Sequence, residues 1–175
     1  RNYDVNKQSN LLVNDINWQS KRLENEIGLD SKFLASLKNI NSKTNNVENF
    51  KDETTTELSS AFGYLAKMNF FKVNNKLKNS QYLTPKILFK YSPHNMRKID
   101  SGRLRYSNLF NLKKFNEFDE IESGTNLSIG FDYSFKKFNK SFKDASEKFN
   151  LSIGQVINES ENLSKPATSS LDQRF

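Results

Sequence analysis

Residues 125–135, TNLSIGFDYSF, alternate between apolar and polar side chains, and no other feature constrains the fold as strongly. Successive side chains of a β-strand point to opposite faces, so this segment forms a strand with one apolar and one polar face. The apolar face carries Leu127, Ile129, Phe131, Tyr133 and Phe135. Such a face requires a cover, which is either a protein core or lipid.

The same period of two recurs in residues 10–19, 29–40, 58–70, 82–93 and 149–155. We therefore expect an all-β fold of antiparallel, up-and-down strands, about six in number and each roughly nine residues or longer. Strands of globular proteins average about 5–6 residues, whereas a tilted strand needs about 9–11 to cross a bilayer. These lengths favour lipid on the apolar face and an aqueous lumen on the polar face.

The connections between these segments alternate in length. Short links near residues 20–25 and 74–79 alternate with long ones at 41–54 and 93–120. Outer-membrane barrels have short turns at one rim and longer loops at the other, so the alternation favours part of a large barrel. Pro85 falls inside a predicted strand, and because proline has no amide donor we expect a bulge or a strand start there.

Composition excludes several classes of protein. Only 35% of residues are hydrophobic, but 13% are aromatic, which is typical of a folded chain. The net charge of +7 is spread without a basic block, which argues against nucleic acid as a partner. There is no cysteine for a disulfide and no run of about 20 apolar residues for a transmembrane helix. The chain starts at Arg1 without a signal peptide, and we expect a piece of a longer protein.

Few residues are candidates for chemistry. His94 stands alone in a predicted loop, and we expect it to be exposed to solvent rather than catalytic. The acidic cluster of Asp119, Glu120 and Glu122 lacks the spacing of a cation site and is typical of a solvated turn or a loop salt bridge. We therefore expect no enzyme, no metal site and no cofactor.

Basic residues gather in the same loop, as Arg97, Lys98, Arg103 and Arg105. Guanidinium and ammonium groups bind phosphate, so one reading of this cluster is contact with anionic phosphates. Ordinary solvated charge is an equal alternative.

Residues 80–158 resemble the C-terminal barrel of the LptD family, which assembles lipopolysaccharide and is also called the organic solvent tolerance family. The resemblance rests on motifs that keep the order and spacing of the family. They are Leu83, Pro85 and Pro93; Tyr106, Leu109 and Phe110; Lys114, Phe115, Phe118, Asp119 and Ile121; Gly130; and Gly154 and Gln155. Residues 11–18 and 59–71 resemble earlier barrel strands of the family only loosely.

The chain departs from the family pattern at several points. Lys114 stands where the family usually has Arg, and Asn116 and Glu117 replace the usual Ser/Pro-Gly. The paired cysteines of some members are absent, so no disulfide coupling of domains is expected. We expect the N-terminal periplasmic domain of the family and the end of the barrel to lie outside residues 1–175, because the final residues do not alternate although they end on Phe175. We interpret residues 1–175 as a partial C-terminal transmembrane barrel domain that is cut within a loop.

The resemblance implies a protein of the Gram-negative outer membrane that transports lipopolysaccharide and inserts it into the outer leaflet, without chemistry of its own. It also implies an LptE-like lipoprotein plug and a periplasmic LptA-like bridge that is reached through the absent N-terminal domain. Candidates for contact with lipid A or core phosphates are Arg97, Arg103 and Arg105. Candidates to fold the loop as a lid or to pack it into the lumen are Tyr106, Leu109, Phe110, Phe115 and Asp119.

Six strands cannot close a barrel around a lumen. We therefore expect a wall panel with two open edges that is unstable alone, in water or in membrane. A generic porin-like channel is an alternative that shares every pattern and lacks only the motif resemblance. A soluble β-sandwich binding module is a further alternative, and it would fold alone in buffer as a monomer.

Overall fold

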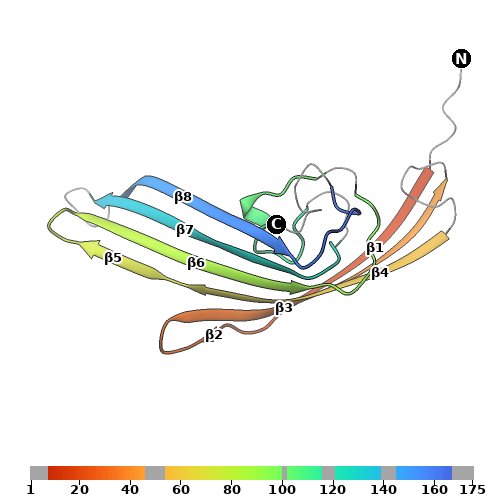
Figure 1. Ribbon diagram of the computed structural model, residues 1–175, viewed down its shortest axis with the longest axis horizontal. Coiled ribbons are helices and arrows are strands. Elements are labelled where there is room, and N and C mark those ends of the chain that lie inside the picture. The colour runs from red at the N-terminus through yellow and green to blue at the C-terminus, as the bar shows by residue number, and fades with distance from the viewer. Residues whose placement is uncertain (1–7, 46–53, 100–101, 116–120, 139–144, 167–175) are drawn as a thin grey trace, which may run out of the picture.

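The computed structural model describes residues 8–45, 54–99, 102–115, 121–138 and 145–166, and these form one antiparallel sheet (Figure 1). Six long strands follow each other in the order β1-β3-β4-β6-β7-β8, while β2 pairs with β3 and β5 with β6. The bounds are β1 Gln8–Gln19, β2 Leu23–Glu24, β3 Leu29–Asn45, β4 Thr54–Met68, β5 Phe70–Asn74, β6 Asn79–Tyr91, β7 Asn126–Phe138 and β8 Ala145–Asn158. This arrangement confirms the all-β prediction and leaves the sheet open at β1 and β8.

The long strands exceed the length that a bilayer requires. They contain 12 to 17 residues, because period-two patterning continues beyond the apolar segments into polar ones. In β6, β7 and β8 the apolar stretches occupy nine positions each, at residues 83–91, 127–135 and 149–157. Their registers align these stretches side by side, as in Phe89↔Leu127 and Leu127↔Ile157. The result is one continuous apolar band across three neighbouring strands.

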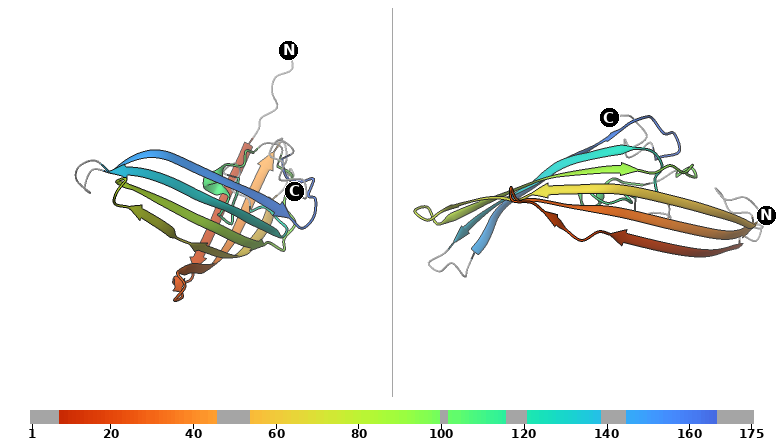
Figure 2. Two further views of the ribbon diagram at one scale, coloured as in Figure 1. Left: turned by 60° about the vertical axis from the view of Figure 1, so that its left-hand side comes forward. Right: turned by 90° about the horizontal axis from the view of Figure 1, so that it is seen from below.

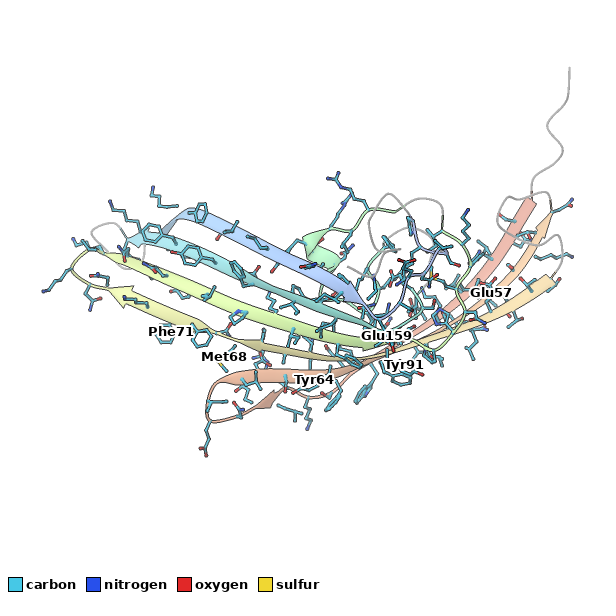
Figure 3. All side chains as sticks on the ribbon, viewed as in Figure 1. Glu57, Tyr64, Met68, Phe71, Tyr91 and Glu159 are labelled. Atoms are coloured by element: carbon cyan, nitrogen blue, oxygen red, sulfur yellow. The ribbon has the colours of Figure 1, made fainter. Side chains whose placement is uncertain are left out.

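The apolar side chains of the strands lie on the exposed face of the sheet. Trp18 is 57% exposed, Phe62 54% and Ile153 51%, although each is large and hydrophobic. Figure 3 places Tyr64 and Tyr91 on this face, on the opposite side of the sheet from the long loop. A soluble sandwich would bury such residues against a second sheet, and the described residues contain only one.

The opposite, polar face is the covered one. The described residues of the long loop between β6 and β7, and residues 159–166 after β8, gather on this side of the sheet (Figure 1), which is twisted (Figure 2). The buried apolar cluster of the described chain lies here, with Leu109 and Phe115 of the loop packed against Val156 of β8. The packed core is therefore formed between loop and sheet, on the face that carries the lysines of the strands.

Pro85 is accommodated differently from the prediction. It lies inside β6, paired with Phe131, so the expectation of a bulge or a strand start at this position is wrong. The irregularity falls on the neighbouring strand, where β4 ends at Met68 and β5 begins at Phe70 without a change of register. Pro85 cannot donate a backbone hydrogen bond from β6, and the sheet accommodates this because the neighbouring strand is interrupted between β4 and β5. The register shifts instead between Phe135 and Lys136 of β7, opposite Lys148 of β8, which is the extra residue in this pair of strands.

The connections alternate less regularly than predicted. β3 extends to Asn45 and β4 begins at Thr54, so the second connection is shorter than residues 41–54. The link at 75–78 is short and the loop at 92–125 is long, as expected. Among the described residues no helix has the length and apolar character needed to cross a membrane.

We predict that residues 1–175 alone aggregate in buffer and give a strand signal in far-UV circular dichroism only in detergent micelles, without a sharp melt. The reason is that the edges at β1 and β8 and the whole apolar face are uncovered. A monomer that unfolds cooperatively in plain buffer would contradict this expectation and favour the soluble sandwich.

Candidate functional site: a loop seated on the polar face

The long loop packs on glycines of the polar face of the sheet, and we call this contact surface the seat of the loop. Gly130 of β7 and Gly154 of β8 are register partners, and neither has a side chain to keep the loop at a distance. A Cβ at Gly154 would overlap Leu109 Cδ2, and one at Gly130 would overlap the backbone carbonyl of the neighbouring strand and lie 3.0 Å from Phe110 Cζ. The short 3₁₀ turn Tyr106–Asn108 brings these loop side chains onto the sheet. Four motif residues, Leu109 and Phe110 of the loop and Gly130 and Gly154 of the strands, thus meet in one contact.

A third glycine extends this seat toward the middle of the sheet. A Cβ at Gly63 of β4 would lie 2.6 Å from Leu112 Cδ2 and 3.1 Å from the carbonyl oxygen of Phe89. Prediction from sequence missed Gly63, although its place on the polar side of an alternating strand was visible. The loop therefore contacts strands β4, β7 and β8 through positions without side chains.

A buried ion pair ties the loop to the strands. Lys90 Nζ of β6 lies 2.7 Å from Glu122 Oε2, with side-chain exposures of 0% and 2%. The other carboxylate oxygen of Glu122 accepts hydrogen bonds from the backbone amides of Lys114 at 2.7 Å and Phe115 at 2.8 Å. Of the two alternatives expected for this acidic cluster, the solvated turn is wrong at Glu122 and the loop salt bridge is confirmed, because its carboxylate binds one strand lysine and the loop backbone.

Lys114 adds a second buried ammonium to this cluster. Its Nζ donates to the carbonyl oxygen of Leu109 and to Ser128 Oγ of β7, both at 3.0 Å. Burial, followed by repulsion from Lys90, lowers the pKa of Lys114 to about 7. Burial alone would raise the pKa of Glu122, but Lys90, the amide of Phe115 and the charge of Lys114 outweigh it and hold this pKa below its ordinary value. The carboxylate is therefore the anchor of the cluster at neutral pH.

A second polar contact holds the turn at Tyr106. Its hydroxyl donates to Asp132 Oδ1 at 2.6 Å, and Ser152 Oγ of β8 donates to the same oxygen at 2.7 Å. Lys86 of β6 pairs with Asp132 and lies 5.8 Å from the ring centroid of Tyr106. Burial, and then the hydrogen bond to the carboxylate, raise the pKa of Tyr106, which keeps the hydroxyl a donor. Strands β6, β7 and β8 each contribute one group to this contact.

His94 lies at the start of the loop and is not simply exposed, as the sequence had led us to expect. Its Nε2 donates to the carbonyl oxygen of Ile121 at 2.7 Å, and its Nδ1 lies 3.2 Å from Ser92 Oγ. Ser92 Oγ in turn donates to the carbonyl oxygen of Ser60 of β4 at 2.6 Å. Burial lowers the pKa of His94, so the ring is neutral when it links the two ends of the loop.

The basic residues of the loop occupy different environments. Arg97 Nη2 lies 3.3 Å from Glu57 Oε2 of β4, whereas Arg103 and Arg105 are exposed. Lys98 is exposed as well. The assignment of Arg97, Arg103 and Arg105 to phosphate contacts remains a prediction.

Other predicted residues lie apart from the seat. Pro85 and Gln155 stand on the apolar face, where Gln155 pairs with Ile129. Asp119 and Glu120 lie outside the described residues. Within the described ranges, no group of three or more His, Cys, Asp or Glu side chains could hold a metal ion.

A comparison with protein families identifies the family of this chain. The family model of LptD, LPS transport system D, matches residues 14–175. The chain belongs to the LptD family. The match covers nearly the whole chain, including the second half of β1 and all of β4, where the resemblance found in the sequence was loose, and β3, where none was stated. No curated protein matches the chain.

We predict that Gly154→Ala loosens the loop by roughly 1–3 kcal/mol, because the new Cβ displaces Leu109 from its buried position. Adding Leu109→Ala should remove the overlap, so the double variant should lose less than the sum of the two single variants. Hydrogen exchange of peptides covering residues 102–115 measures the effect. Asn150→Ala, an exposed position on the same strand, serves as control, and additive losses would contradict the proposed contact.

We predict that acid releases the loop. Stabilisation by Glu122 is complete above its ordinary pKa of 4.5 and is lost as the pH falls through its lower folded pKa. A nitroxide label at Asn111→Cys should gain mobility over that range. Glu122→Gln leaves Lys90 buried without its carboxylate, which costs about 3–5 kcal/mol, so this variant should already be mobile at pH 7. A label that stays immobile at low pH would show that the ion pair does not hold the loop.

Proposed function

We propose that this chain is part of the barrel wall of an outer-membrane translocon that passes lipopolysaccharide through its lumen and inserts it into the outer leaflet. Membership in the LptD family places the chain in a lipopolysaccharide transport system, and this observation carries the proposal. The sheet adds physical support. Its exposed face has an apolar band nine residues wide, and its covered face carries Lys86, Lys90 and Asp132.

The chain contributes a wall and a loop rather than a catalyst. The buried lysines, Glu122 and Tyr106 hold each other and the loop, so their polar atoms serve positioning. The amphiphilic substrate then moves as an intact molecule, with sugars along the polar face and acyl chains toward the lipid on the other. We propose that the loop fills part of the lumen and limits its free cross-section.

The proposed location is the outer membrane of a Gram-negative cell. An LptE-like lipoprotein plug and a periplasmic LptA-like bridge belong to the proposal because the family resemblance implies them. A porin-like channel shares the two-faced strands, but the family match favours lipopolysaccharide transport.

We predict that depleting the whole protein stops newly made lipopolysaccharide from reaching the cell surface, as measured by an impermeant antibody on pulse-labelled cells. Wild type and Asn150→Lys, on the polar side, should restore delivery. Ile153→Lys should fail, since a lysine toward lipid at the middle of the band costs about 2–4 kcal/mol. Normal delivery with reduced uptake of small solutes would instead identify a diffusion channel.

A further inference from the structure

The exposed apolar face of the sheet ends in lysines at the end that carries the short turn 75–78. On this face, Lys72 of β5 comes two residues after Phe70, and Lys137 of β7 comes two residues after Phe135. The registers run from β5 through β6 to β7 without a shift, so alternation places both lysines on the same face as the apolar band. The exposed lysines at this end of the sheet are called the basic rim here, and they are Lys72, Lys76, Lys78, Lys137 and Lys148.

The basic rim has few acidic residues near it. Residues 70–83, 133–138 and 148–151 contain no aspartate or glutamate. Glu147 of β8 stands opposite Lys136 in the register, and Lys136 is not part of the rim, because alternation places it on the polar face. Within the described part of the chain, no ion pair engages four of the rim lysines, which are Lys72, Lys76, Lys78 and Lys148. These four side chains therefore carry positive charge that no described carboxylate neutralises.

The distance along the strands places the rim at the level of lipid headgroups. Two residues of a strand advance about 7 Å, and less along the membrane normal when the strand is tilted. The headgroup layer on each side of the hydrocarbon is about 5–7 Å thick. If the apolar band spans the hydrocarbon, Lys72 and Lys137 lie in this layer. A lysine at such a boundary keeps its ammonium group among polar groups while its methylene groups remain at the apolar edge.

The opposite end of the apolar band on β6, β7 and β8 has no such lysines. The band ends there at Tyr91, Leu127 and Ile157, and the residues that follow at the same spacing are Pro93, Thr125 and Glu159. The basic rim is at the end of the turn 75–78, which Figure 1 shows far from the long loop. Short turns of outer-membrane barrels face the periplasm, so the rim is at the periplasmic leaflet. The charge of these strands is therefore distributed so that it distinguishes one leaflet from the other.

We propose that the basic rim binds the anionic headgroups of phospholipids in the periplasmic leaflet, with Lys72 and Lys137 as the contacts at the edge of the apolar band. The inference rests on the proposed function, because it requires that the apolar band faces lipid. The partner is a structural lipid on the outside of the wall and is distinct from the transported molecule. Lys76 and Lys78 lie further along the hairpin and add an attraction that falls off within about 8–10 Å at physiological ionic strength.

The test uses the full-length protein in nanodiscs that contain equal amounts of phosphatidylglycerol and phosphatidylcholine. A photo-crosslinking amino acid replaces Gln81, which pairs with Lys72 in the register and lies on the same face. Mass spectrometry of the captured lipid should show phosphatidylglycerol enriched about fivefold, which is the factor expected for one lysine near an anionic surface. The same amino acid at Tyr91, at the other end of the band, should capture both lipids equally.

Substitutions and salt then test the lysines. Lys72→Gln with Lys137→Gln should lower the enrichment at Gln81 about threefold or more. Lys43→Gln removes an exposed lysine on the same face at the long-loop end of β3, and it should leave the enrichment unchanged. About 0.5 M sodium chloride should lower the enrichment in the protein without lysine substitutions, so this arm does not depend on a variant that could disturb folding.

Equal capture of the two phospholipids at Gln81 would overturn the proposal, and so would an enrichment that persists both in the double variant and at high salt. Either result leaves the proposed function standing, provided that the crosslinker at Tyr91 captures lipid. If the crosslinker captures no lipid at either position, the apolar band does not face a bilayer. That result would overturn the proposed function and the inference with it, so the two failures are distinguishable.

Discussion

The pairing of Lys90 with Glu122 is the interaction on which the arrangement of the loop depends. A strand lysine with no exposed side-chain surface must have a partner, because an isolated buried charge is strongly unfavourable. The carboxylate that meets it also binds two backbone amides of its own loop, so one side chain both folds the loop and attaches it to β6. A buried ion pair adds little net stability compared with apolar packing, but it is selective for one geometry. Here that geometry fixes the register of the loop on the sheet.

The sheet reverses the usual relation between patterning and burial. Its apolar residues are exposed, and its polar face is covered by a loop that brings its own apolar side chains, Leu109, Phe110 and Phe115. Apolar side chains can pack on a polar face only where the strands leave room for them. The glycines provide this room, since every one of the three would meet a loop side chain if it carried a Cβ. Glycine in a strand therefore marks the approach of another segment here rather than a weakness of the strand.

Much of this arrangement was predictable from the sequence. Period-two alternation gave the six long strands and their two faces, and the motif residues Gly130, Gly154, Leu109 and Phe110 do meet. The C-terminal end of β3 was not predictable from apolar residues. There the burial of alternate residues continues through Ser42 and Thr44, which are polar. The bulge or strand start predicted at Pro85 was wrong, because the interruption falls on the neighbouring strand at Asn69. The side chain of Asn69 accepts a hydrogen bond from Thr84. The pairing of Lys90 with Glu122 spans 32 residues, and no local pattern encodes a contact across such a distance.

The nature of the seat determines what it takes to move the loop. Releasing the loop breaks ion pairs and hydrogen bonds on a face that water can solvate, and it also exposes the apolar cluster around Leu109 and Phe115. A seat made of apolar side chains would have to overcome the hydrophobic effect over the whole contact area. A polar seat can instead exchange its internal hydrogen bonds for bonds to water or to a polar ligand, and the net change of free energy for each exchange is small. The loop is thereby held in one geometry at rest, and the free energy that opposes its displacement is concentrated in Glu122 and the small apolar cluster around Leu109.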